Sequence, residues 1–191
     1  MIAIVIACTI AWGGLNTLLS PQGLIFAVVL FFTIGIAFIA HEMGHKWAAG
    51  KCGAASRFVM WPAGILLMLA MSPLGFIFAA PGAVYILKPY LTKRESGLIS
   101  LAGPSVNFVL YLFFALLLVL SAYAGLSLSD IVKEIALLGL RINSFLAFFN
   151  LLPLFVLDGA KVWHWNGLAW GAAFLVSILA MVLAESFVIF I

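Results

Sequence analysis

Residues 24–45 read LIFAVVLFFTIGIAFIAHEMGH, an apolar run that ends in two histidines and a glutamate. Residues 1–40 contain no Asp, Glu, Lys, Arg or His, so His41, Glu42 and His45 are the first residues of these types in the chain. About 20 consecutive apolar residues are enough for a helix to cross the hydrocarbon core of a bilayer. The stretch therefore predicts a membrane-spanning helix, from residue 24 to near residue 49, with three polar side chains near one end.

The spacing of the two histidines suits a metal ion. Residues four apart lie on the same face of an α-helix, so the imidazoles of His41 and His45 can reach one ion. Glu42 follows His41 directly, about 100° round the helix, and is close enough to polarise a water held by that ion. An HExxH pattern on a helix is a signature of zinc hydrolases. The alternative, a chance pair of core histidines, is weakened by the scarcity of histidine, of which the chain has 3.

Composition places the chain in a lipid bilayer. Of its 191 residues, 66% are hydrophobic and 8% are charged, and its mean hydropathy is +1.30. A soluble domain is about half apolar and a quarter charged. At about 20 residues per span, the length predicts one all-α polytopic domain, residues 1–191, with a bundle of roughly five or six transmembrane helices. The basic residues are not interleaved with aromatic ones, so we expect no nucleic-acid partner.

Other long apolar stretches mark the remaining helices. They cover residues 2–19, residues 96–124, a stretch that ends near Asn150 before Pro153, and residues 167–190. Residues 58–87 are also free of charge, but they are too few for two spanning helices and a turn.

Several prolines and glycines interrupt residues 58–87. We expect a short membrane-dipping, partly β segment here, between the second and third long spans, with strand-like pieces at 57–61 and 76–86. Irregular backbone at that depth must be covered by protein or line a wet cavity. A strand edge in this segment can pair with an extended substrate. A plain packing insertion is the alternative.

The distribution of basic residues predicts the orientation, because cytoplasmic loops are enriched in Lys and Arg. If the HExxH end of its helix faces the cytoplasm, seven basic residues lie on that side: Lys46, Lys51, Arg57, Lys88, Lys93, Arg94 and Lys161. Only Lys133 and Arg141 remain for the other side. We therefore expect a multi-pass protein of the cytoplasmic membrane, with the HExxH site toward the cytoplasm and a cytoplasmic N-terminus.

Two histidines leave a zinc site incomplete, because a catalytic zinc usually takes three protein ligands and a water. The further candidates are Asp158, Glu185, His164 and Cys52. Asp158 is favoured, since it falls near the cytoplasmic end of its helix and an ionisable residue in an apolar span usually has a partner. An interfacial aspartate that ends a helix before Gly159 is the alternative. His164 lies between two tryptophans, as in an interfacial aromatic belt, and Glu185 falls toward the opposite side.

Two asparagines stand in polar breaks of the apolar pattern. Pro104 removes a backbone donor and frees a carbonyl inside the membrane. Asn107 can satisfy that carbonyl or hydrogen-bond a metal ligand, and Asn150 can donate its amide to a substrate carbonyl. For both, the alternative is structural hydrogen bonding between helices.

Three motifs together resemble a known family. HEMGH at 41–45, AGPSVN at 102–107 and NLLPLFVLDG at 150–159 resemble, in order and spacing, the site-2 protease family of intramembrane zinc metalloproteases. The resemblance covers residues 22–160, the expected catalytic core. It implies one zinc per chain held by His41, His45 and Asp158, with Glu42 as the base. Within the family, the chain resembles the compact prokaryotic members, which lack an inserted PDZ domain. Many relatives carry a second proline in the last motif, where this chain has Leu154-Phe155-Val156.

The resemblance implies hydrolysis of a peptide bond in or near the transmembrane segment of a membrane-anchored protein. Two alternatives stay open. A membrane transporter that binds metal would place more ionisable residues along a path through the bilayer, and this chain offers only Arg141 and Glu185 beyond the candidate site. A catalytically inactive family member would most simply lack the base, but Glu42 is present.

Overall fold

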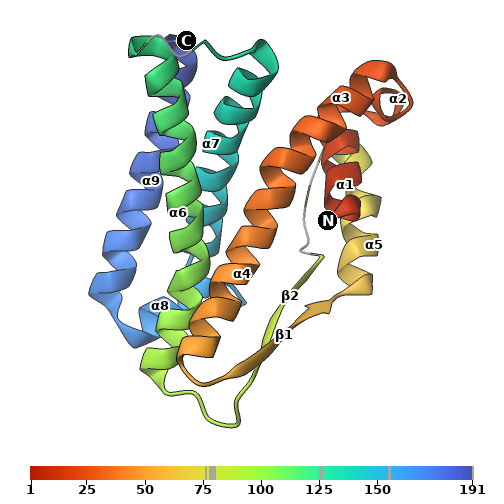
Figure 1. Ribbon diagram of the computed structural model, residues 1–191. Coiled ribbons are helices and arrows are strands. Elements are labelled where there is room, and N and C mark those ends of the chain that lie inside the picture. Colours follow the sequence, from red (N-terminus) through yellow and green to blue (C-terminus); the bar gives the residue numbers. More distant parts are fainter. Residues whose placement is uncertain (76, 78–80, 125–126, 155, 191) are drawn as a thin grey trace.

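The structure is a computed structural model that describes residues 1–75, 77, 81–124, 127–154 and 156–190, apart from the side chains of residue 18 and residues 187–190. Most of the chain is helical, with one two-stranded sheet (Figure 1). In the described part, three helices are long and apolar enough to cross a membrane: Pro21–Lys51, Lys93–Tyr123 and Gly167–Ser186. The prediction of a largely α-helical membrane protein is therefore confirmed, and the count of five or six spans stays a prediction.

The elements follow in the order α1 (Ile2–Gly13), α2 (Leu15–Leu18), α3 (Pro21–Leu30), η1 (Phe31–Gly35), α4 (Ile36–Lys51), β1 (Ala55–Met60), α5 (Pro62–Met71), η2 (Ser72–Leu74), β2 (Gly82–Leu87), α6 (Lys93–Tyr123), α7 (Asp130–Asn150), α8 (Asp158–Trp165) and α9 (Gly167–Phe190). The helices predicted at 24–49, at 96–124, up to Asn150 and at 167–190 are all present. The stretch 2–19 is not one helix. It is divided at Gly14, whose φ of 79° is a conformation that glycine adopts at little cost.

The helix that carries HExxH is longer than predicted. α3, the π-helical turn η1 and α4 run on as one helix of 31 residues. It begins at Pro21, where the Ser20 side chain accepts a hydrogen bond from the Gly23 amide at 3.0 Å. Near its middle, the Thr33 hydroxyl donates to the Val29 carbonyl at 2.8 Å. Such bonds compete with the regular helix pattern, and the π turn lies at this point.

The segment after α4 contains the sheet. β1 and β2 pair antiparallel, with Phe58 opposite Val84. The partly β prediction is thus confirmed, but helix α5 between the strands was not predicted. Pro62 stands at its first position, where proline starts a helix instead of breaking it. The second strand begins at Gly82, and of the predicted start at 76–81, residues 76 and 78–80 lie outside the described residues.

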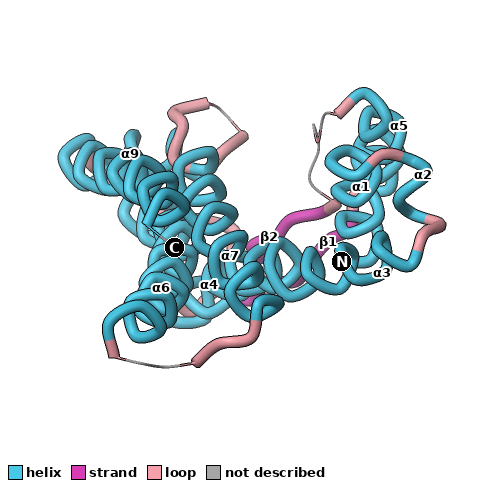
Figure 2. Tube along the Cα trace, turned by 90° about the horizontal axis from the view of Figure 1, so that it is seen from above, coloured by secondary structure: helices cyan, strands magenta, loops and turns pink. Residues whose placement is uncertain are grey.

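The elements form two groups, and helix α4 belongs to the first and borders the strands beside it. Helices α4, α6, α7 and α9 form one bundle, in which α6 contacts α4, α7 and α8 (Figure 1). Helices α1, α3 and α5 gather on the other side, and the strands lie between the two groups (Figure 2). Because α4 contacts α6, β1 and β2, its polar end is enclosed by both the bundle and the hairpin.

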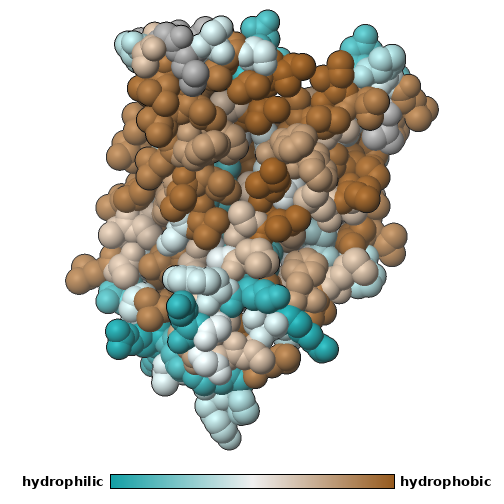
Figure 3. Space-filling view, viewed as in Figure 1, coloured by the Kyte–Doolittle hydropathy of each residue, from teal (hydrophilic) through white to brown (hydrophobic). Residues whose placement is uncertain are grey.

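Figure 3 shows a hydrophobic band with a large hydrophilic region at its lower end and smaller hydrophilic patches at its upper end. The hydrophilic end holds the last turn of α4, the first turn of α6 and helix α8, as comparison with Figure 1 shows. The HExxH residues therefore lie close to a polar end of a molecule whose middle is apolar, which is the arrangement of an integral membrane protein.

Candidate metal centre

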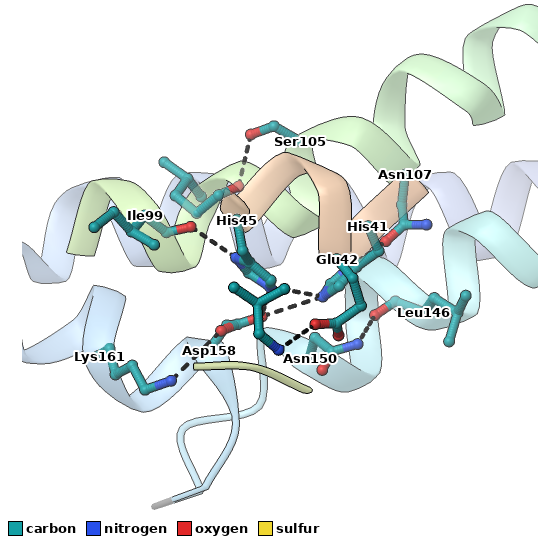
Figure 4. Close-up of polar contacts among 12 residues, drawn as sticks. His41, Glu42, His45, Ile99, Ser105, Asn107, Leu146, Asn150, Asp158 and Lys161 are labelled. Atoms are coloured by element: carbon teal, nitrogen blue, oxygen red, sulfur yellow. Dashed lines mark hydrogen bonds and ion pairs between the residues drawn. The ribbon is translucent and has the colours of Figure 1, made fainter. Parts of the chain in front are cut away.

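His41, His45 and Asp158 converge from two helices (Figure 4). The Nε2 atoms of the two histidines are 3.0 Å apart. Asp158 Oδ2 lies 3.3 Å from His41 Nε2 and 3.1 Å from His45 Nε2. All three residues are buried, with exposed fractions of 4%, 9% and 8%. The structure thus brings together the three residues that the sequence suggested as ligands.

The spacing of these three atoms fits a zinc ion. Zinc binds nitrogen and oxygen ligands at about 2.0–2.1 Å, and in a tetrahedral site two neighbouring ligand atoms are then about 3.3 Å apart. The observed separations of 3.0, 3.1 and 3.3 Å form a triangle close to one face of that tetrahedron. Two imidazoles and one carboxylate also match the ligand chemistry of catalytic zinc, with a fourth position left for water.

Each imidazole also makes a hydrogen bond through Nδ1, the ring nitrogen that faces away from the centre. His41 Nδ1 is 2.6 Å from Oδ1 of Asn107, and His45 Nδ1 is 2.8 Å from the carbonyl oxygen of Ile99. A metal-binding histidine commonly donates its second ring N–H to such an acceptor, which fixes the tautomer and the ring orientation. Asn107 therefore contacts a candidate ligand and also hydrogen-bonds Asn143 on α7, so two of the three readings that the sequence left open are both present.

Glycine on α6 makes room for the imidazoles. A Cβ atom on Gly103 would lie 2.5 Å from His45 Nε2 and 2.6 Å from His41 Nε2. A Cβ atom on Gly44 would lie 2.8 Å from the Ala102 carbonyl oxygen, so α4 and α6 approach closely here as well. Sequence reasoning missed Gly103, although it stands in the AGPSVN motif, because a glycine carries no charge or ligand atom to signal its role.

Asp158 occupies a different position from the one expected. It is the first residue of α8 and does not end a helix; residues 151–154, 156 and 157 before it are not helical. Burial alone raises the pKa of its carboxyl, but the two imidazoles outweigh burial when they are protonated and donate from Nε2, and the pKa is then lowered. Lys161 Nζ lies 3.8 Å from the other carboxylate oxygen, Oδ1. The carboxylate of Asp158 thus faces the two imidazoles through one oxygen and the Lys161 ammonium through the other.

Glu42 faces the same centre and also contacts the sheet. Its carboxylate oxygen and the ligand nitrogens of the two histidines all lie within 4.8 Å of one another, so distance alone allows Glu42 as a ligand. However, Glu42 Oε2 accepts a hydrogen bond from the backbone amide of Val84 at 2.7 Å. Asp158 is nearer to both imidazoles, which favours Asp158 as the third ligand and leaves Glu42 beside the centre.

The other candidates lie elsewhere. Among the described residues, neither His164 nor Cys52 belongs to the group around His41 and His45 that could hold a metal ion. Glu185 pairs with Arg141 at 2.6 Å on the surface of α7 and α9. Asn150 donates its side-chain amide to the Leu146 carbonyl of its own helix at 2.9 Å.

Comparison with known proteins gives consistent results. The sequence profile of peptidase family M50 matches residues 29–134, which include HExxH and Asn107. The chain is 42% identical over 145 residues to "Putative zinc metalloprotease MJ0611" of Methanocaldococcus jannaschii, which covers 75% of this chain and 73% of that protein. It is 30% identical over 168 residues to "Putative zinc metalloprotease Rip2" of Mycolicibacterium smegmatis, covering 78% of this chain and 61% of that protein.

A third relative, "Zinc metalloprotease MJ0392" of Methanocaldococcus jannaschii, is 26% identical over 141 residues, covering 72% of this chain but 34% of that protein. No solved structure matches the chain significantly. In place of an inserted PDZ domain, the described residues between α4 and α6 contain two strands and the short elements α5 and η2. With its HExxH helix and the profile match over more than half of its length, the chain belongs to peptidase family M50, the site-2 protease family.

Proposed function

We propose that this protein is a zinc-dependent intramembrane endopeptidase that cleaves membrane-anchored proteins in or near their transmembrane segments. The observation that carries the proposal is the triangle of His41 Nε2, His45 Nε2 and Asp158 Oδ2, whose sides of 3.0–3.3 Å suit zinc. The triangle lies near the polar end of a long apolar helix. Family membership and relatives named as zinc metalloproteases support the same function.

Each residue of the centre has a distinct proposed role. His41, His45 and Asp158 hold one zinc ion per chain, and when bound, the ion acidifies a water ligand and polarises the substrate carbonyl. Glu42 accepts the proton of the attacking water and returns it to the leaving amine, as a general base and then a general acid. Asn107 orients the ring of His41.

The edge of β2 is the proposed binding site for substrate. Trp61 donates its amide to the Pro81 carbonyl at 2.9 Å, so positions 81, 83 and 85 bond toward β1. In an antiparallel ladder the alternate residues direct their amides outward, and the Val84 amide accordingly reaches Glu42. An extended substrate segment that adds to this edge would lie alongside the proposed base. The Val84 amide would then bind a substrate carbonyl in place of Glu42.

A substrate helix must unwind to bind in this way, because its carbonyls are otherwise occupied by helical hydrogen bonds. Val84→Pro removes the outward amide without removing a bond to β1, whereas Val84→Ala keeps that amide. We expect Val84→Pro to raise KM for a single-span substrate far more than Val84→Ala does. Equal effects of the two variants would contradict pairing through this amide.

The topology is part of the proposal. Residues 1–191 form one domain with a catalytic core at 22–160 and five or six spans, and both the site and the N-terminus face the cytoplasm. The hydrophilic end in Figure 3 supports this orientation, since it coincides with the ends of α4 and α6 that bear Lys46, Lys51, Lys93 and Arg94.

The test uses purified protein, metal analysis and a model substrate with one transmembrane segment. Glu42→Gln keeps the size of the side chain but cannot accept the proton, so zinc content should be unchanged while the cleavage rate falls about 10²–10⁴-fold. Wild-type protein that binds zinc but cleaves no membrane-anchored substrate would favour the inactive alternative. Zinc uptake into vesicles without cleavage would favour the transporter. Near wild-type cleavage by Glu42→Gln would overturn the role of Glu42.

A further inference from the structure

Asn143 on α7 has no role in the site as described so far, although its side chain is completely buried. Its Nδ2 donates to the Gly139 carbonyl of the same helix at 2.7 Å. Its Oδ1 accepts a hydrogen bond from Asn107 Nδ2 at 2.9 Å. Since Asn107 Oδ1 lies 2.6 Å from His41 Nδ1, a continuous chain of hydrogen bonds links the backbone of α7 to the imidazole.

The direction of every bond in this chain follows from its first member. A backbone carbonyl only accepts hydrogen bonds, so the amide nitrogen of Asn143, not its oxygen, must face Gly139. The Asn143 oxygen then faces Asn107, which must present its own nitrogen to it. The Asn107 oxygen is therefore left for His41, whose Nδ1 must carry the hydrogen. His41 Nε2 is consequently unprotonated in the neutral ring and faces Asp158 and His45 with its lone pair.

We infer that Asn143 is a positioning residue that keeps His41 in the tautomer able to bind the metal. This inference rests on the proposed role of His41 as a zinc ligand. His45 needs no such residue, because its Nδ1 faces the Ile99 carbonyl directly at 2.8 Å, and a carbonyl fixes the tautomer by itself. Asn107 alone does not fix it, since a side-chain amide can turn over and exchange its oxygen for its nitrogen.

One other contact opposes that turn. Asn107 Nδ2 lies 3.5 Å from the Ala37 carbonyl, at the outer limit of a hydrogen bond and much longer than the 2.9 Å bond to Asn143. Removing Asn143 should therefore weaken the preference for one orientation of Asn107 without abolishing it. The expected consequence is a mixture of His41 tautomers, while His45 stays in a single one.

The alternative is a purely structural role, in which Asn143 only joins α6 to α7, as polar side chains often do between membrane helices. The two readings differ in what they predict for His41. A purely structural Asn143 would contribute to the stability of the bundle, but the tautomer of His41 and the zinc affinity of the folded protein would not depend on it.

The experiment measures tautomers in the full-length, metal-free protein in detergent micelles, at a pH high enough for the histidine rings to be neutral. The chain has 3 histidines, so ¹⁵N-histidine labelling gives three sets of ring signals, which long-range ¹H–¹⁵N correlation assigns to tautomers. His164, exposed on α8, is the internal reference. Asn143→Ala should populate the second tautomer at His41 alone. Asn143→Leu is the second variant in case the alanine protein does not fold.

Zinc affinity is the second readout, measured by competition with a chelator. Loss of a residue that directly orients a metal-binding histidine typically weakens binding about 10–100-fold. Asn143 acts through Asn107, and a protein in which about half of His41 stays in the metal-binding tautomer should bind zinc about 2-fold more weakly, because the apparent affinity falls with the competent fraction. Asn143→Asp should restore the tautomer when protonated, because its hydroxyl can donate to Gly139 while its other oxygen accepts from Asn107. Ser144→Ala is the matched control, since within the described part of the chain the buried Ser144 hydroxyl bonds to the Arg141 carbonyl of its own helix and to no residue of the site.

Unchanged His41 tautomers and zinc affinity in a folded Asn143→Ala or Asn143→Leu protein would overturn the inference and leave the proposed function intact. Failure of the wild-type protein to bind zinc would instead refute the proposed function. In that case the tautomer measurement would still show whether Asn143 orients His41.

Discussion

Replacing Gly103 by alanine sets two effects against each other. Alanine is favoured over glycine inside a helix by roughly 1 kcal/mol, so α6 by itself should become more stable. The new Cβ atom, however, would lie 2.5 Å from His45 Nε2 and 2.6 Å from His41 Nε2, whereas ordinary contacts begin at 3.4 Å. The rings, or the helices that carry them, must therefore move apart by about 0.8–0.9 Å.

A displacement of this size is large for a metal site. Ligand distances are expected to stay within about 0.2 Å of their ideal values, and misplacing a reacting group by about 1 Å can cost about 10²-fold in rate. We therefore expect Gly103→Ala to lose most of its zinc and at least 10²-fold in cleavage, while its helix content stays near that of the wild type and its Tm stays near that of zinc-free wild-type protein. Zinc is measured by elemental analysis of purified protein, and cleavage with a single-span substrate.

The control is the same substitution where space is free. A Cβ atom on Gly50, in the last turn of α4, meets nothing within 4 Å. Gly50→Ala should therefore keep both zinc and activity. If Gly103→Ala binds one zinc and cleaves at the wild-type rate, the imidazoles do not lie against α6 as the structure has them, and the reasoning is refuted.

Three further predictions concern the metal and the orientation. Asp158→Ala should lose most bound zinc. Asp130→Ala, which also replaces an aspartate at the first position of a helix, should keep its zinc. Full zinc occupancy in Asp158→Ala would exclude that residue as a ligand. Removal of zinc with a chelator should abolish cleavage and lower Tm, and added zinc should restore both, since a ligand present at 100 times its Kd stabilises the folded state by about 2.7 kcal/mol; a Tm that does not depend on zinc would argue against a specific site. In a variant without native cysteines, Lys93→Cys should react only with a reagent that enters the cytoplasm, and Ser127→Cys with an impermeant reagent outside; the opposite pattern would reverse the topology.

Much of the fold follows from local properties of the sequence. Long apolar stretches form helices in a bilayer because every backbone amide must be paired within the chain, so α4, α6 and α9 could be located from composition alone. The positions of His41 and His45 could also be read directly, because a separation of four residues fixes their relation on any helix. Prediction failed where local backbone geometry overrides the apolar pattern. Gly14 divides the first apolar stretch with its positive φ. Pro62 starts helix α5 in a segment that was predicted to be irregular because it contains prolines and glycines.

The closure of the centre depended on contacts between distant segments. Asp158 reaches the histidines because α8 starts soon after α7 ends and packs against α6 and α9, an arrangement that no periodicity encodes. The roles of Gly103, Asn143 and the Val84 amide were not predicted. Each depends on how closely the group approaches another element, and the residue type alone does not indicate that. Residue types and their spacing establish which groups are available to bind a metal and which helix carries two of them. How closely α6, α7, α8 and β2 approach that helix is set by the packing of whole elements, and it is therefore known from the folded structure alone.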